Sequence, residues 1–142
     1  MAHLGFIINP IAGMGGRVGL KGTDAVVAEA TRLGAAPIAN ARALETLREF
    51  KGLLNLDTQL PAVHWLTCSG AMGFEALQVA GFEHVELVHE VIGETTDHDT
   101  REAVRRFMAL GVDLILFCGG DGTARDICSV TGKAIPVLGI PS

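Results

Sequence analysis

The sequence predicts an α/β fold: a Rossmann-like open parallel sheet of about five strands, with helices on both faces. Three observations predict it. Short apolar runs recur along the chain, helical patterns lie between them, and small or polar residues follow most of the runs. The runs are Leu4–Ile8, Val63–Thr67, Val85–His89, Asp113–Cys118 and Ala134–Ile140. This alternation indicates βαβ units with right-handed crossovers.

The strand predictions rest on runs that are nearly continuous in aliphatic residues, as after Leu4 and after Leu114. Such runs are typical of strands that are buried on both faces of a sheet. The stretch Pro37–Pro61 is expected to form a helix and a loop that cap the sheet. Helices are expected before the third strand over Asp24–Leu33, Ala43–Phe50 and Gly73–Ala80.

The clearest helical pattern covers Asp97–Leu110, and Gly111 is expected to end it. Thr96 is the expected N-cap, and acidic residues in the first turn favour the positive end of the helix dipole. A last short helix is expected over Thr123–Val130, directly after a cluster of glycines.

The composition is that of one globular domain, residues 1–142, with 49 % apolar and 19 % charged residues. A net charge of −5 and the lack of any Lys/Arg-rich run argue against nucleic acid as a partner. No apolar run is long enough to span a membrane, and no signal peptide is recognisable. The three cysteines show no CxxC spacing, which indicates reduced thiols and a cytoplasmic location.

The strongest motif is Cys118-Gly-Gly-Asp-Gly-Thr123, between a buried strand and a helix. Its three glycines allow the backbone to pass close to a phosphate, and the N-terminus of the next helix favours an anion. A carboxylate at Asp121 repels a phosphate unless it binds magnesium or takes a proton from an attacking hydroxyl. The alternative is a helix-capping aspartate in a tight turn.

A second glycine-rich segment, Asn9–Gly22, follows the first strand. It does not fit the Walker A pattern, because Lys21 follows Leu20 instead of a glycine. It does not fit GxGxxG either, because Val18 stands where the third glycine belongs. The residues alone leave two readings open, a flexible loop or a phosphate cradle.

Other chemistry-bearing side chains give weaker signals. His64, His84, His89 and His98 show no metal-ligand spacing, so no metal site is assigned to them. Ser69 lies outside any GxSxG pattern, which argues against nucleophilic catalysis.

Asn9-Pro-Ile-Ala-Gly13 and Gly119-Gly-Asp-Gly-Thr123 together resemble the NAD kinase and diacylglycerol kinase superfamily. The run Asn9–Gly22 and Gly93-Glu-Thr-Thr-x-x-Asp-Thr100 look most like its bacterial and archaeal ATP-NAD kinase-like branch, which includes acetoin-catabolism accessory proteins. The resemblance covers nearly the whole chain and implies the N-terminal domain of that family. It also implies a second, mainly β domain after Ser142, which holds much of the acceptor site.

The resemblance implies phosphoryl transfer from ATP, with Mg²⁺, to the 2′-hydroxyl of NAD or a related dinucleotide. Asp121 would activate that hydroxyl and lie near the magnesium ion. For Thr95 and Thr96, a plain N-cap role is the alternative to a phosphate contact. The implied contacts are Asn9, Pro10, Gly13, Gly15, Gly16, Thr95, Thr96, Gly119, Gly120, Gly122 and Thr123.

Two other functions remain open at this point. One is a lipid or sphingoid-base kinase of the same superfamily, although the sequence has no evident membrane-binding patch. The other is a nucleotide-binding accessory protein without turnover, against which the intact Asp121 argues. A homo-oligomer is also expected, because an open sheet leaves an edge or a face uncovered.

Overall fold

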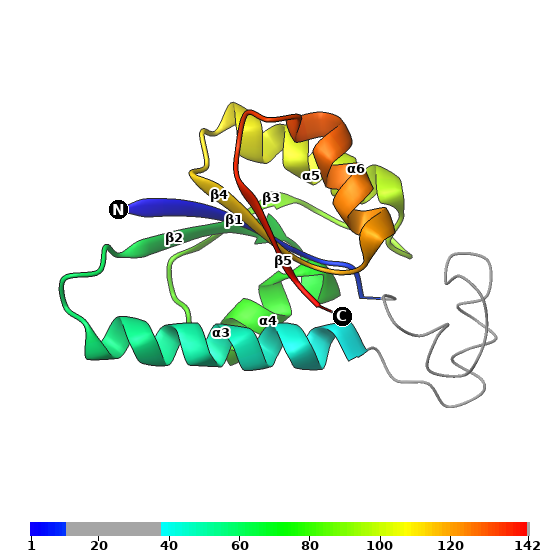
Figure 1. Ribbon diagram of the computed structural model, residues 1–142. Helices are drawn as coiled ribbons and strands as arrows, with labels where there is room; N and C mark the ends of the chain where they lie inside the picture. Colours follow the sequence, from blue (N-terminus) through cyan, green and yellow to red (C-terminus); the bar gives the residue numbers. More distant parts are fainter. Residues whose placement is uncertain (11–37, 142) are drawn as a thin grey trace.

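The computed structural model describes residues 1–10 and 38–141, and its five strands form one parallel, open sheet in the order β3-β2-β1-β4-β5. Figure 1 shows this sheet between two layers of helices. The predicted fold class is therefore confirmed, and each predicted apolar run overlaps one strand. The strands are β1 (Ala2–Ile8), β2 (Val63–Cys68), β3 (Val85–His89), β4 (Leu114–Cys118) and β5 (Val137–Ile140).

The strand order reverses direction once. From β1 the chain proceeds outward to β2 and then to the edge strand β3, before it returns across the sheet to β4 on the other side of β1. The reversal therefore lies between β1 and β4. In open parallel sheets, ligands bind outside the carboxyl ends of the strands at such a point.

Four α-helices in the described part of the chain cover the two faces (Figure 1). Helices α3 (Ile38–Leu56) and α4 (Phe74–Val79) pack together on one face, with a 3-10 turn (Gly70–Met72) before α4. Helices α5 (Asp97–Ala109) and α6 (Asp121–Thr131) pack together on the other face. None of these helices is long and apolar enough to cross a membrane.

The core between the sheet and α3 is rich in aromatic side chains. Trp65 of β2 is fully buried, and its ring lies 5.7 Å from Phe6, 6.0 Å from Phe50 and 5.1 Å from Phe82, measured between centroids. Such edge-to-face pairs contribute about 0.5–1.5 kcal/mol each beyond the area they bury. Trp65 is the only tryptophan of the chain, so its fluorescence reports the integrity of this layer.

The core under α5 and α6 is mainly aliphatic, and it depends on one close approach. Phe107 of α5 is fully buried against Gly5 of β1, where an added Cβ would lie 2.6 Å from a ring carbon. Because only glycine leaves room for that ring, Gly5 sets the distance between α5 and the sheet. Val104, Ile115 and Ile127 are fully buried in the same core.

The helix boundaries differ from the predictions at two places. Helix α3 is longer than the predicted Ala43–Phe50, because its last turns carry Gly52 and the exposed Leu53 and Leu56, which obscure the amphipathic pattern. Helix α6 begins before the predicted Thr123, within the glycine cluster. The predicted helix over Asp24–Leu33 lies outside the described residues.

Candidate functional site

The carboxyl ends of β1 and β4 are joined directly at the point where the strand order reverses. The backbone N–H of Asn9 donates to the carbonyl of Cys118 over 2.8 Å, which extends the strand pairing by one residue. The side-chain amide of Asn9 donates to the hydroxyl of Thr123 over 3.1 Å, and Thr123 is 5 % exposed. Asn9 therefore ties the end of β1 to the first turn of α6.

The first turn of α6 faces this edge without a side-chain cap. Its N-cap is Gly120, which has no side chain, and the first helical hydrogen bond runs from Ala124 N–H to the Gly120 carbonyl over 3.1 Å. The N–H groups of Asp121, Gly122 and Thr123 precede that bond and have no acceptor within the helix ladder. Together with the helix dipole, they form a site that favours an anion.

The glycines of the motif have different physical reasons. A Cβ at Gly119 would lie 2.6 Å from Thr123 Oγ1 and 2.8 Å from Thr123 Cβ, so packing against Thr123 requires glycine there. Among the residues that the structure describes, nothing lies within 4 Å of a Cβ at Gly120 or Gly122. Internal packing therefore explains the first glycine, whereas open space for an approaching ligand fits the other two.

Asp121 occupies the first position of α6 and is exposed at the same edge. Its carboxylate stands beside the positive end of the helix. No group of three or more His, Cys, Asp or Glu side chains that could hold a metal ion occurs among the described residues. Magnesium usually takes one or two protein carboxylates and completes its shell with phosphates and water, so a single exposed carboxylate fits a magnesium ion that arrives with a nucleotide.

The N-terminus of α5 is built differently, with its own side chains as partners. The Asp99 carboxylate accepts a hydrogen bond from the Thr96 N–H over 2.9 Å and from the Thr96 hydroxyl over 3.3 Å. Thr96 is thus the N-cap that the sequence predicts. A contact from Thr95 or Thr96 to a phosphate stays a prediction.

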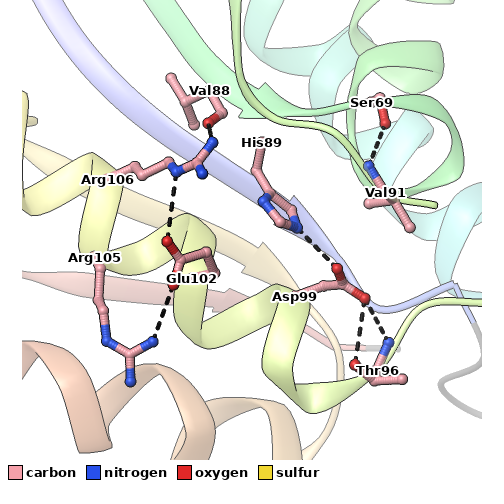
Figure 2. Close-up of polar contacts among 9 residues, drawn as sticks. All are labelled: Ser69, Val88, His89, Val91, Thr96, Asp99, Glu102, Arg105 and Arg106. Atoms are coloured by element: carbon pink, nitrogen blue, oxygen red, sulfur yellow. Dashed lines mark hydrogen bonds and ion pairs between the residues drawn. The ribbon is translucent and has the colours of Figure 1, made fainter.

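Figure 2 shows a second partner of Asp99, which the sequence analysis missed. His89, at the end of β3, donates from Nε2 to Asp99 Oδ1 over 2.8 Å, and both side chains are largely buried. Burial alone would raise the pKa of Asp99, but the hydrogen bonds from His89 and Thr96 outweigh it and lower that pKa. The sequence pointed to Asp99 only as an acidic residue in the first turn of the helix, and nothing in the sequence pointed to its contact with His89.

Neither buried cysteine is suited to nucleophilic chemistry. Burial raises the pKa of Cys68 to about 12 and that of Cys118 to about 11, so both are neutral thiols near pH 7. Cys128 is exposed on α6, and none of the three forms a disulfide. Ser69 Oγ accepts a hydrogen bond from the Val91 N–H over 2.8 Å, which fixes the loop after β3 (Figure 2).

The structure thus brings one part of the predicted site together. Asn9 and Pro10 follow β1, and the motif from Gly119 to Thr123 follows β4 at the adjoining strand end. Gly13, Gly15 and Gly16 lie outside the described residues. Thr95 and Thr96 precede α5, and Arg101 Nη1 of that helix is 3.4 Å from Asp126 Oδ1 of α6, which links the two helices.

Comparison with known proteins identifies the family of the chain. No curated protein and no solved structure matches the chain. The family of ATP-NAD kinase N-terminal domains matches residues 4–142. The match spans the end of β1, the motif from Gly119 to Thr123 and the sheet from Leu4 onward. The chain belongs to the NAD kinase family, as its N-terminal, nucleotide-binding domain.

Proposed function

We propose that this domain takes part in ATP-dependent phosphoryl transfer to the 2′-hydroxyl of NAD or a related dinucleotide. One observation carries the proposal: Asn9, the uncapped N-terminus of α6 and the exposed Asp121 meet where β1 and β4 end side by side. Phosphate-binding groups and one carboxylate at a single crevice are what such a transfer requires.

The phosphates of ATP fit against the N-terminus of α6 in this proposal. The backbone at Gly120 and Gly122 leaves open space, so a phosphate can approach the N–H groups of the first turn. Asn9 keeps the Thr123 hydroxyl in place and thereby fixes the turn. The loop after Pro10 and Thr95, which precedes the N-cap of α5, would add further phosphate contacts.

Asp121 would act as the base. As the 2′-hydroxyl oxygen attacks the γ-phosphorus, its proton passes to the Asp121 carboxylate, the bond to the β,γ-bridging oxygen breaks, and ADP leaves. Asp121 would also lie near the magnesium ion that accompanies ATP, and that ion would supply charge neutralisation for the transferred phosphoryl group. The remaining rate enhancement comes from holding the two substrates in line.

The first experiment uses the complete gene product, with any segment encoded after Ser142. Incubation with Mg²⁺, ATP and NAD should yield NADP. Asp121→Asn should lower turnover by about 10²–10⁴-fold, the usual contribution of a general base, while ATP affinity is retained. The matched control is Asp57→Asn, an exposed aspartate in the loop after α3, which should keep full turnover.

The outcomes separate the candidate functions. If the Asp121→Asn variant still forms NADP at the wild-type rate, Asp121 is not the general base. ATP binding without NADP formation would favour another acceptor, such as a lipid or sphingoid base, or an accessory protein without turnover. Replacement of ATP by polyphosphate in the same assay identifies the phosphoryl donor.

A cytoplasmic homo-oligomer belongs to the same proposal. The two edge strands carry exposed apolar side chains, Leu87 on β3 and Leu138 on β5, which are 51 % and 57 % exposed. Unprotected edges of this kind tend to pair with another copy. Sedimentation velocity should therefore show a dimer or larger species, and a monomer at high protein concentration would contradict this.

A further inference from the structure

The amino-terminal edge of the sheet, opposite the crevice, carries polar side chains on three adjacent strands. His3 of β1 stands directly opposite His64 of β2 in the strand register. Glu86 of β3 is opposite Leu66, two residues further along β2, so it shares a face with both histidines. This face is the one that α5 covers further along the strands, since Leu66 belongs to the core under that helix.

The two imidazole rings point at each other through the same ring nitrogen. His3 Nδ1 and His64 Nδ1 are 3.1 Å apart, the ring centroids are 5.2 Å apart, and the planes meet at 79°. One proton between the nitrogens satisfies this contact. On its far side, His64 Nε2 is 3.6 Å from Glu86 Oε1, which favours a proton on Nε2 and leaves a lone pair on Nδ1.

The separation of the two nitrogens is also close to what a metal ion requires. Two imidazole nitrogens bound to zinc at 2.0–2.1 Å with a tetrahedral angle lie about 3.3–3.4 Å apart. The two nitrogens therefore need to separate by only a few tenths of an ångström, and each ring must turn so that its Nδ1 lone pair points at an ion that lies off the line between them. A carboxylate on the outer nitrogen of a metal-binding histidine is the usual partner that orients the ring and raises its basicity.

We propose that His3 and His64 form a binding site for a divalent late transition-metal ion such as Zn²⁺, with Glu86 as the outer partner of His64. The ion replaces the proton between the two Nδ1 atoms, and His3 then carries its proton on Nε2. The carboxylate of Asp113 accepts a hydrogen bond from the backbone N–H of His3 over 2.9 Å and adds negative charge beside the site. Because the described residues supply no third ligand, water completes the shell and the ion exchanges readily.

The site is separate from the proposed phosphoryl transfer and binds a different class of ion. Magnesium prefers oxygen ligands, whereas imidazole selects zinc, copper and nickel. A zinc ion bound by His3 and His64 is expected to join β1 to β2. It should thereby stabilise the fold, because a ligand that binds only the folded state shifts the unfolding equilibrium.

The test is a calorimetric titration of the metal-free protein with ZnCl₂ in the presence of excess Mg²⁺. The wild-type protein should bind one zinc ion. His3→Ala and His64→Ala should each lose this binding step, and Glu86→Gln should weaken it by about 10-fold. The matched control is His98→Ala, which removes an exposed histidine of α5 and should leave zinc affinity unchanged.

A second measurement separates a metal ligand from a structural hydrogen bond. His64→Gln keeps a hydrogen-bond acceptor near His3 but is a poor zinc ligand. Thermal unfolding followed by Trp65 fluorescence should show similar midpoints for this variant and the wild type without zinc, and a zinc-dependent rise only in the wild type. Absence of saturable zinc binding to the wild type would overturn the proposal. Unchanged binding to His64→Ala would also overturn it, because the ion would then be held elsewhere.

Discussion

The two helices on one face of the sheet begin in opposite ways. Helix α5 starts at Thr96, whose N–H and hydroxyl both bond to the Asp99 carboxylate, and His89 holds the other oxygen of that carboxylate (Figure 2). Helix α6 starts at Gly120, which offers no side chain at all. The N-terminus of α5 is thus capped by side chains of the protein. The N-terminus of α6 has no side-chain cap and lies at the carboxyl ends of β1 and β4.

This difference indicates which N-terminus serves a ligand. A capped helix end has little left to offer a phosphate, because its own carboxylate already lies at the positive end of the dipole. A helix end without a side-chain cap, beside a strand-order reversal, combines backbone N–H donors outside the helix ladder with a suitable position. We therefore expect changes at α6 to alter nucleotide affinity, and changes at α5 to alter stability alone.

The largest effect is expected from Gly119→Ala. The added Cβ would overlap the buried Thr123 side chain, at 2.6 Å from its hydroxyl, and overpacking of this kind costs about 1–3 kcal/mol in the free energy of unfolding. Nucleotide affinity should fall as well, because the first turn of α6 must shift. Gly120→Ala is the matched control for stability, since a Cβ there meets nothing within 4 Å and should cost less than about 0.5 kcal/mol. Urea unfolding, monitored by Trp65 fluorescence, measures the free energy of unfolding of both variants. Equal losses in the two variants would show that the Thr123 side chain can move aside for the added Cβ.

A smaller effect is expected from Asp99→Asn at the start of α5. Hydrogen bonds to a charged group are lost, which should lower the free energy of unfolding by about 1–2 kcal/mol at pH 7. The pKa of Asp99 is lowered in the folded protein, so its stabilisation is complete above the unfolded pKa of about 3.9 and is lost as the pH falls through the folded value. Unfolding measured from pH 7 to pH 2.5 should therefore converge for the two proteins at the acid end. A constant difference across that range would show that the charge of Asp99 contributes nothing.

Thr123→Val should cost about 1 kcal/mol, because the shape is kept while the acceptor for the Asn9 side chain is lost. The same variant should weaken ATP binding, which calorimetry measures. A double-mutant cycle with Asn9→Ala gives the coupling between the two side chains. Coupling close to zero would mean that each residue acts on the crevice independently.

The smallest effect is expected from Thr96→Ala. Removal of the N-cap hydroxyl should cost about 0.5–1 kcal/mol, while the N–H of residue 96 still reaches Asp99. ATP affinity should stay the same. A loss of ATP affinity in this variant would instead assign Thr96 a direct contact with the nucleotide and weaken the contrast between the two helices.

Sequence alone was sufficient for the features that depend on local pattern. The strands follow from continuous aliphatic runs, and the start of α5 follows from Thr96 and the acidic residues behind it. The start of α6 was placed too late, because Gly120 and Gly122 are typical of loops and conceal the helix that tertiary packing stabilises there.

Features that depend on strand order could not be predicted in this way. The contact between Asn9 and Thr123 joins residues 114 positions apart, and it exists because β1 and β4 are neighbours. The facing of His3 and His64 likewise requires the parallel register of β1 and β2, which the spacing of histidines along the chain does not reveal.

The Asn9–Thr123 contact also has a consequence for how the protein is made. Thr123, which accepts from the Asn9 side chain, is synthesised 114 residues after Asn9, and Cys118, which accepts from the Asn9 backbone, is synthesised shortly before Thr123. Until β4 has emerged, β1 therefore has an open side where β4 will pair. Contacts of such long sequence separation slow folding, so the crevice is completed late and the nascent chain gains its affinity for nucleotide only after α6 has emerged.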